Sequence, residues 1–156
     1  MRKEEINERL TAQAFDFFYW FSRFEFALKE HGYLKNQQEG ANAEPCWNKF
    51  VASYSEQFVI TRDSYQLMSL APKRQKVGKN KELVWESVGR QGCNNTLCMV
   101  IRLLKTIRNN LFHGGKHGAD GWDDPKRMQE LLAAGKNVLD QLAKMADWEA
   151  DYTQYY

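Results

Sequence analysis

The chain has 156 residues, of which 43% are hydrophobic and 13% aromatic, so it can bury a core and is not disordered. The formal net charge of +2 is too small to indicate nucleic-acid binding by itself, so attraction to phosphate would have to come from local clusters. Three cysteines without a C-x-x-C pair argue against a disulfide scaffold or zinc ribbon and favour reduced thiols. Neither a signal peptide nor a run of about 20 apolar residues is evident, which predicts a cytoplasmic protein without a membrane segment.

Residues 4–30 are expected to form a long first helix with aromatic side chains on most of its circumference. Only a narrow strip through Asp16, Arg23 and Glu30 is polar. A helix that is apolar on nearly all sides is buried on more than one side. It would lie at the centre of a bundle, or between the core and a second subunit.

The middle of the chain is more polar. A second helix is predicted from Pro45 to about residue 59, and residues 63–70 either continue it or form a separate turn. Residues 72–81 carry five basic side chains and no acidic one, which fits a phosphate-gripping loop or, more simply, a solvated loop tip. Residues 83–88 are expected to form a short helix.

The most informative segment is residues 97–116. Gly114 and Gly115 would end this helix, and Asn94 or Asn95 would cap its start. At about 100° per residue, Arg108 falls inside the apolar face, whereas Arg102, Lys105, Asn109 and His113 form a separate polar stripe. Apolar residues recur along it at the three-and-four spacing of one helical face: Leu97, Val100, Ile101, Leu104, Ile107 and Leu111.

Asp124 followed by Pro125 marks the start of a last helix that runs to about Met145. Residues 149–156 are expected to be a loose tail. No convincing alternating strand or internal repeat is present. The predicted fold is therefore a single all-α domain over residues 1–156, a four- to five-helix up-and-down bundle.

A guanidinium on an apolar face needs an acceptor, because arginine does not lose its charge on burial. Arg108 would meet a carboxylate, a second subunit or a bound phosphate; alternatively it bends outward into solvent at the last turn. Glu25, which points between aromatic side chains of the first helix, is a candidate partner. The alternative for Glu25 is a surface pair with Lys29.

Most familiar chemical motifs are absent from the sequence. There is no Walker A sequence, no G-x-G-x-x-G after a strand and no recognisable nucleophile motif. His113 and His117 are separated by two glycines and lack an intervening glutamate, so no metal site and no cofactor are predicted. What remains is Arg108 followed, after four residues, by His113, with the polar Asn109 directly after the arginine.

This R-N-N-L-F-H-G-G-K segment resembles the R-x4-6-H signature of the HEPN superfamily, and is most similar to small prokaryotic HEPN proteins of toxin–antitoxin and phage-defence systems. Sharp similarity covers about residues 107–116. The resemblance implies a HEPN-like bundle that acts as a metal-independent endoribonuclease, with two motifs facing each other across a homodimer. A partner antitoxin protein, for example of the nucleotidyltransferase type, is a further candidate partner, and the sequence does not show whether one silences the chain.

The resemblance assigns the catalytic roles to Arg108, Asn109 and His113. A histidine side chain has an unperturbed pKa near neutrality, so the residue type at position 113 is suited to moving the proton of the ribose 2′-hydroxyl, and Arg108 can stabilise charge on the phosphate. Arg108 and His113 are about 140° apart on one helix, so two facing helices would be needed to bring both to one point. Lys116, Arg102 and Lys105 would guide the RNA backbone.

Simpler interpretations stand beside this one. His113 can merely cap a helix end, and the three RNA-guiding side chains can merely be solvated. The chain can also be a HEPN fold without catalysis that binds RNA or nucleotides or serves in dimerisation. A purely structural helical adaptor, however, would not need a guanidinium on an apolar face.

Overall fold

The computed structural model describes residues 8–113 and 124–154. Within these ranges the chain is mostly helical, with one small two-stranded antiparallel sheet. None of the helices in the described ranges is long and apolar enough to cross a bilayer. The elements in chain order are α1 (Glu8–Glu30), α2 (Trp47–Tyr54), α3 (Arg62–Leu70), β1 (Arg74–Val77), the 3-10 turn η2 (Lys79–Lys81), β2 (Leu83–Glu86), α4 (Thr96–His113), α5 (Pro125–Met145) and α6 (Glu149–Thr153).

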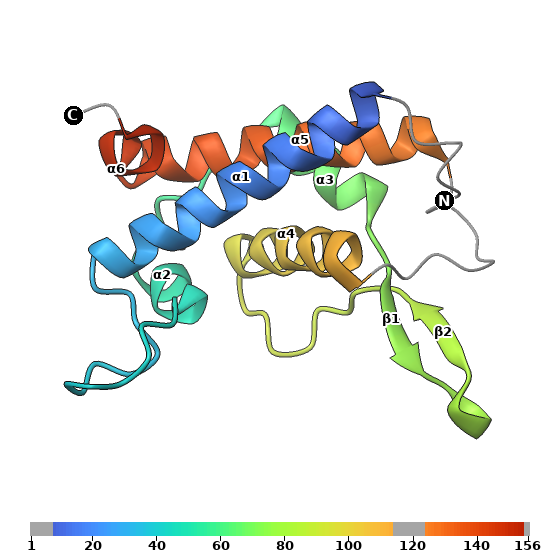
Figure 1. The fold of residues 1–156 in the computed structure, drawn as a ribbon, viewed down its shortest axis with the longest axis horizontal. Coiled ribbons are helices and arrows are strands. Elements are labelled where there is room, and N and C mark those ends of the chain that lie inside the picture. The colour runs from blue at the N-terminus through green and yellow to red at the C-terminus, as the bar shows by residue number, and fades with distance from the viewer. Residues whose placement is uncertain (1–7, 114–123, 155–156) are drawn as a thin grey trace.

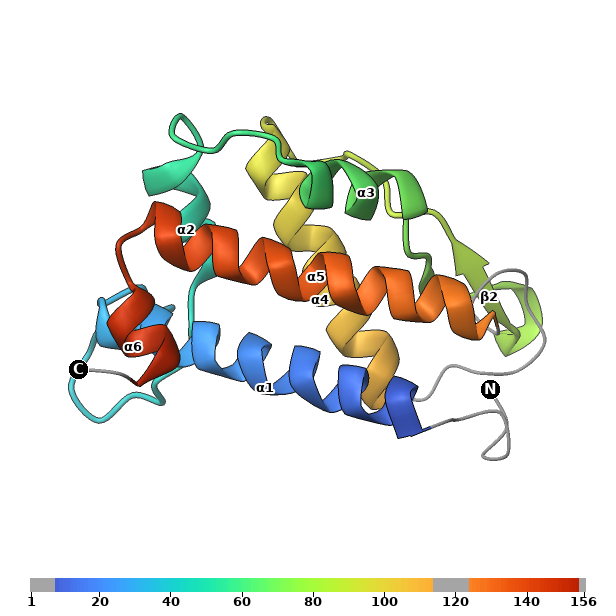
Figure 2. The ribbon, with the colours of Figure 1, turned by 90° about the horizontal axis from the view of Figure 1, so that it is seen from above.

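Helices α1 and α5 lie side by side and run in the same direction, and α4 crosses beneath them obliquely (Figures 1 and 2). The three helices meet at Gly135 of α5. A Cβ atom at this position would lie 2.7 Å from Cε2 of Phe17 and 3.5 Å from Cδ1 of Ile107. Since real Cβ contacts do not approach 2.7 Å, the missing side chain lets α5 pack closely on α1, while Ile107 of α4 lies at an ordinary contact distance.

The two long helices of the second half begin as predicted. The Asn95 side chain accepts a hydrogen bond from the backbone N–H of Cys98 over 2.8 Å, at the start of α4. At the start of α5, the Asp124 side chain accepts one from the N–H of Lys126 over 3.0 Å, and Pro125 occupies the first turn. Local capping chemistry therefore fixes both helix starts.

The segment after the first helix differs from the prediction. The second helix, α2, ends at Tyr54 rather than near residue 59. Residues 62–70 form a helix of their own, α3, which begins at a capping box between Thr61 and Ser64. The reciprocal bonds of that box start a new helix there, so the alternative of one continuous helix is wrong.

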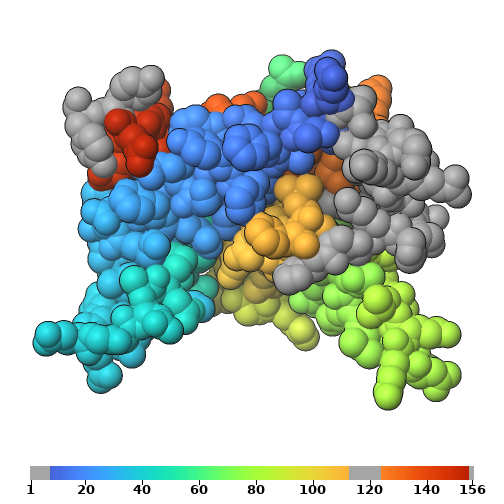
Figure 3. All heavy atoms as spheres, in the orientation of Figure 1, coloured from blue at the N-terminus to red at the C-terminus, as the bar shows by residue number. Residues whose placement is uncertain are grey.

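Residues 74–86 form a β-hairpin, so the expected loop at 72–81 and short helix at 83–88 are wrong. Its strands pair in register from Arg74 with Glu86 to Val77 with Leu83. Asn80 has a φ of 55°, a left-handed conformation that a continuing helix cannot accommodate and that reverses the chain. The hairpin projects from the helical body (Figures 1 and 3).

The C-terminal residues 149–153 are not a loose tail but the helix α6, which packs on α1. Tyr152 is buried and donates its hydroxyl hydrogen to Asp140 over 2.9 Å. Arg23 is buried beneath it and donates from Nε to the Tyr152 carbonyl over 3.2 Å. Of the polar strip on the first helix, Arg23 is covered because it satisfies carbonyl groups of α6, whereas Asp16 and Glu30 remain exposed.

Cys93 and Cys98 form a disulfide, whereas Cys46 is a free thiol. The expectation of three reduced cysteines is therefore wrong for two of them. The pairing could not be read from the sequence because no motif marks it, and the loop before α4 brings the two residues together. The cysteine argument for a cytoplasmic protein accordingly loses its force.

We expect replacement of Cys93 by serine to lower thermal stability. Closing a loop of this length is worth about 2 kcal/mol in the chain-entropy model, which corresponds to roughly 5 °C in Tm for a chain of this size. Calorimetry of Cys93→Ser beside Cys46→Ser checks this. Thiol titration of the unfolded, unreduced chain should find the single thiol of Cys46; finding three would contradict the disulfide.

Candidate functional site

Arg108 is half-buried in the last third of α4, where it faces α1. Its Nη2 lies 3.8 Å from Oε1 of Glu25, and its guanidinium carbon lies 5.4 Å from the ring centroid of Phe21. The aromatic ring and the carboxylate both favour a cation at this position. Among the alternatives for Arg108, the structure therefore selects a carboxylate partner on the first helix.

Glu25 is itself held in place. Trp47 of α2 donates its indole N–H to Oε1 of Glu25 over 3.0 Å. The same oxygen faces Arg108, but the 3.8 Å separation is longer than a hydrogen bond. The ion pair thus orients the Arg108 guanidinium while leaving it the capacity to bind another anion.

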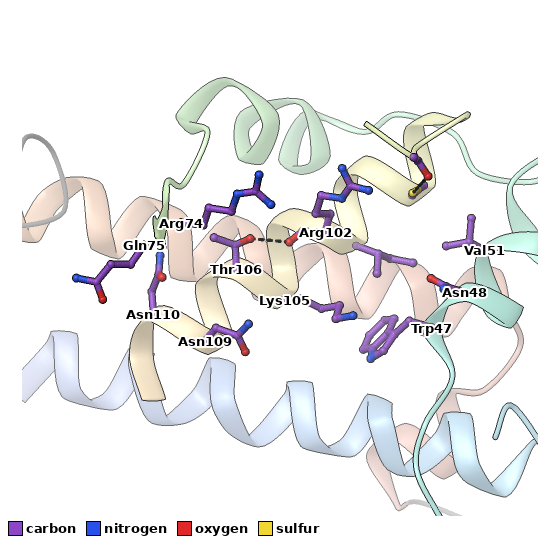
Figure 4. A pocket seen from close by; sticks show the side chains of 13 residues that line it. Trp47, Asn48, Val51, Arg74, Gln75, Arg102, Lys105, Thr106, Asn109 and Asn110 are labelled. Atoms are coloured by element: carbon purple, nitrogen blue, oxygen red, sulfur yellow. Dashed lines mark hydrogen bonds between the residues drawn. The ribbon is translucent and has the colours of Figure 1, made fainter. Parts of the chain in front are cut away.

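A pocket of about 620 Å³ lies between α2, β1 and α4, beside this ion pair (Figure 4). Its cationic side chains are Arg74 of β1 and Arg102 and Lys105 of α4. None of its lining residues is acidic. The other lining residues are Trp47, Asn48, Val51, Gln75, Gly92, Cys98, Ile101, Thr106, Asn109 and Asn110.

The cations of the pocket repel one another. The pKa of Lys105 is lowered, first by the loss of hydration in the pocket and then by the positive charge of Arg108 one turn away. Arg102 donates from Nη1 to the carbonyl of Gly89 over 2.6 Å, which ties it to the loop before α4. Positive charge concentrated without a lining carboxylate creates a local attraction for phosphate that the net charge does not reveal.

Amide side chains complete the pocket. Asn109 is exposed to the pocket, whereas Asn110 is buried and donates to the carbonyl of Lys73 over 2.8 Å. The Asn110 bond therefore connects α4 to the strand that carries Arg74. Side-chain amides offer both donors and acceptors, which suits the edge of a nucleobase.

The predicted site residues thus fall into two groups. Arg102, Lys105 and Asn109 come together in the pocket, as the polar stripe on the helix predicted, whereas Arg108 faces α1 beside it. His113 is the last residue of α4, and its side chain lies outside the described part of the structure. Lys116 lies outside the described residues altogether.

Sequence analysis missed Arg74, Asn48, Gln75 and Asn110 as pocket residues. The signal for Arg74 was the basic run at 72–81. That run did not reveal which of its five cations would turn toward the helices, because the choice depends on the hairpin. No sequence signal distinguished the three amides.

An exposed aromatic patch adjoins the Arg108 region. It consists of Phe15, Phe18 and Tyr19 of α1 and Phe112 of α4. Phe15 and Phe112 are 68% and 61% exposed, and the rings of Phe18 and Phe112 lie 5.1 Å apart. Figure 3 shows α1 and the C-terminal part of α4 adjoining on one face of the molecule. Contiguous exposed aromatic area of this kind is typical of protein–protein contact surfaces.

Among the residues that the structure describes, no group of three or more His, Cys, Asp or Glu side chains is placed to hold a metal ion. No protein-family model, curated protein or solved structure matches this chain.

Proposed function

We propose that this chain is a HEPN-like, metal-independent endoribonuclease of the cytoplasm that cleaves RNA from a composite site in a homodimer. The observation that carries the proposal is the position of Arg108. It is half-buried against α1, only loosely paired with Glu25, and adjacent in sequence to Asn109, which lines the basic pocket. An arginine whose partner leaves it capacity for an anion is suited to a phosphate whose charge grows in the transition state.

The reaction is an internal transesterification of RNA. The 2′-oxygen bonds to the neighbouring phosphorus while the bond from phosphorus to the 5′-oxygen breaks, leaving a 2′,3′-cyclic phosphate and a 5′-hydroxyl. A base must take the proton of the 2′-hydroxyl, and an acid must supply one to the leaving oxygen. The two copies of His113 in a dimer supply these groups, and Arg108 stabilises the charged phosphate.

Incubating labelled RNA with the purified chain in EDTA tests this function. Cleavage should continue in EDTA, yield cyclic phosphate ends, and disappear in His113→Ala. An absolute requirement for a divalent ion would contradict the mechanism. RNA that is bound but never cut would favour the second candidate, a HEPN-like module that binds RNA without catalysis, which the acid-free basic pocket also supports.

The exposed aromatic patch is the surface we expect the second copy to cover. Replacing Phe112 with aspartate should convert the dimer into a monomer and abolish cleavage, because it places a charge in the middle of apolar contacts. Analytical ultracentrifugation measures the change, with Tyr65→Asp on α3 as the control, since Tyr65 is similarly exposed at 66%. A parent chain that cleaves RNA as an 18.3 kDa monomer would contradict the composite site.

The proposed activity would need to be controlled in the cell. A ribonuclease of this kind would act as a toxin or a phage-defence effector, and a partner antitoxin protein would hold it silent until needed.

A further inference from the structure

We propose that the pocket between α2, β1 and α4 binds one nucleotide of single-stranded RNA, with the phosphate against its cations Arg74, Arg102 and Lys105 and the base edge against its amides Asn48 and Asn109. This inference rests on the proposed function, because it names the form of RNA that the chain accepts. Arg74, Asn48 and Gln75 were not part of the expected site, whereas Asn109 was.

Three cations on two elements, β1 and α4, would hold the phosphate. Arg74 reaches in from β1, and Figure 4 shows it directed toward Arg102 of α4. The Nε of Arg74 is buried without a hydrogen-bond partner, although Nη2 of the same side chain pairs with Glu86 over 3.1 Å. The lining residues include three cations and no carboxylate, so a bound anion would reduce the repulsion between the cations. The pKa of Lys105, already lowered, should return toward its usual value on that binding.

Amide side chains that line the same pocket would meet the base. Asn48 comes from α2 and Asn109 from α4, whereas Gln75 lies beside Arg74 on β1 and Figure 4 shows it directed away from Arg102. Trp47 closes the wall, but its ring stacks on Phe24 at 5.0 Å, so one of its faces is already covered. Recognition of the base therefore depends on hydrogen bonds to its edge rather than on a full stacking sandwich.

The size and depth of the pocket favour a single strand. About 620 Å³ falls within the range of small-ligand pockets, so it can admit one unstacked nucleotide. Bases in an A-form duplex remain stacked and paired, and the duplex presents only its grooves and backbone. A duplex would therefore miss the amides.

The test uses two matched variants of one strand. Arg74 and Lys76 are both on β1 and both pair with Glu86, at 3.1 and 2.6 Å, but only Arg74 lines the pocket. All variants carry His113→Ala, so that the RNA is not cleaved during the measurement. Fluorescence anisotropy then gives the affinity for a labelled oligouridylate and for an RNA duplex. Arg74→Gln should weaken oligouridylate binding about tenfold or more, since it removes a charged hydrogen-bonding group. Lys76→Gln should change it less than twofold.

Equal losses in Arg74→Gln and Lys76→Gln would overturn the proposal, because they would show diffuse attraction to the hairpin. Equal affinity for duplex and single strand would also overturn it. Asn48→Leu should weaken oligouridylate binding while leaving inorganic phosphate binding intact. Unchanged binding of both ligands would contradict the proposed contact between the base and Asn48. A chain that binds oligouridylate through Arg74 but never cleaves RNA in its parent form would refute the nuclease while supporting the pocket.

Discussion

Replacing Arg108 with alanine should lower the rate of RNA cleavage by about 10²-fold or more, the effect seen when one preorganised donor to a transition-state oxyanion is removed. The guanidinium is oriented by Phe21 and Glu25 before RNA arrives, so it needs no reorganisation when charge develops. Single-turnover cleavage measured at saturating enzyme isolates this step from binding. Arg62→Ala, which removes an exposed arginine at the first turn of α3, should leave the rate unchanged.

Glu25→Gln separates a catalytic arginine from a purely structural ion pair. The amide oxygen can still accept the indole hydrogen of Trp47, so only the charge opposite Arg108 is lost. A half-exposed pair at 3.8 Å is worth about 1 kcal/mol or less, so cleavage should change less than about fivefold. If Arg108→Ala and Glu25→Gln lowered Tm equally and left cleavage equally intact, Arg108 would be a structural residue.

Replacing Phe24 with alanine should be the most destabilising single change in the core. Phe24 is fully buried, and its ring lies 5.0, 5.3 and 6.0 Å from the rings of Trp47, Phe50 and Trp148. Removing a buried phenyl ring costs about 3–5 kcal/mol, because a cavity remains where the neighbours cannot collapse. For a chain of this size the loss corresponds to roughly 10 °C in Tm, measurable by calorimetry.

The control for this prediction is an aromatic side chain outside the core. Tyr65→Ala removes a ring that is 66% exposed, so stability should stay within about 0.5 kcal/mol of the parent. Similar losses for Phe24→Ala and Tyr65→Ala would contradict the ring cluster that joins α1, α2 and the residues after α5. Phe24→Ala should also weaken RNA binding, because Trp47 stacks on Phe24 and lines the pocket.

The long helices could be predicted from the sequence because their signals are local. Five of the six periodic apolar residues of α4 are buried and Leu111 is partly buried, and Asn95 and Asp124 cap the helices as predicted. The partnership of Arg108 with Glu25 could be anticipated for a related reason: an aromatic helix with one carboxylate offers few acceptors to a guanidinium on an apolar face.

The hairpin, the last helix and the pocket could not be predicted in this way. Each strand of the hairpin has only four residues, too few to establish an alternation, and the turn at Asn80 decides the pairing. Helix α6 depends on the bonds from Arg23, more than 120 positions away in the sequence. Because Arg74 reaches the pocket only through the hairpin, the error about the strands concealed the third cation of the site.

Gly135 has no side chain at a point where the packing of the core is tight. The same point faces Phe17 on one side and Ile107 on the other, and Ile107 immediately precedes Arg108. A side chain introduced there would collide with the Phe17 ring and push α5 away from α1, whereas Ile107 lies at an ordinary contact distance. Substitution at Gly135 is therefore expected to be poorly tolerated, although this position lies outside the candidate site.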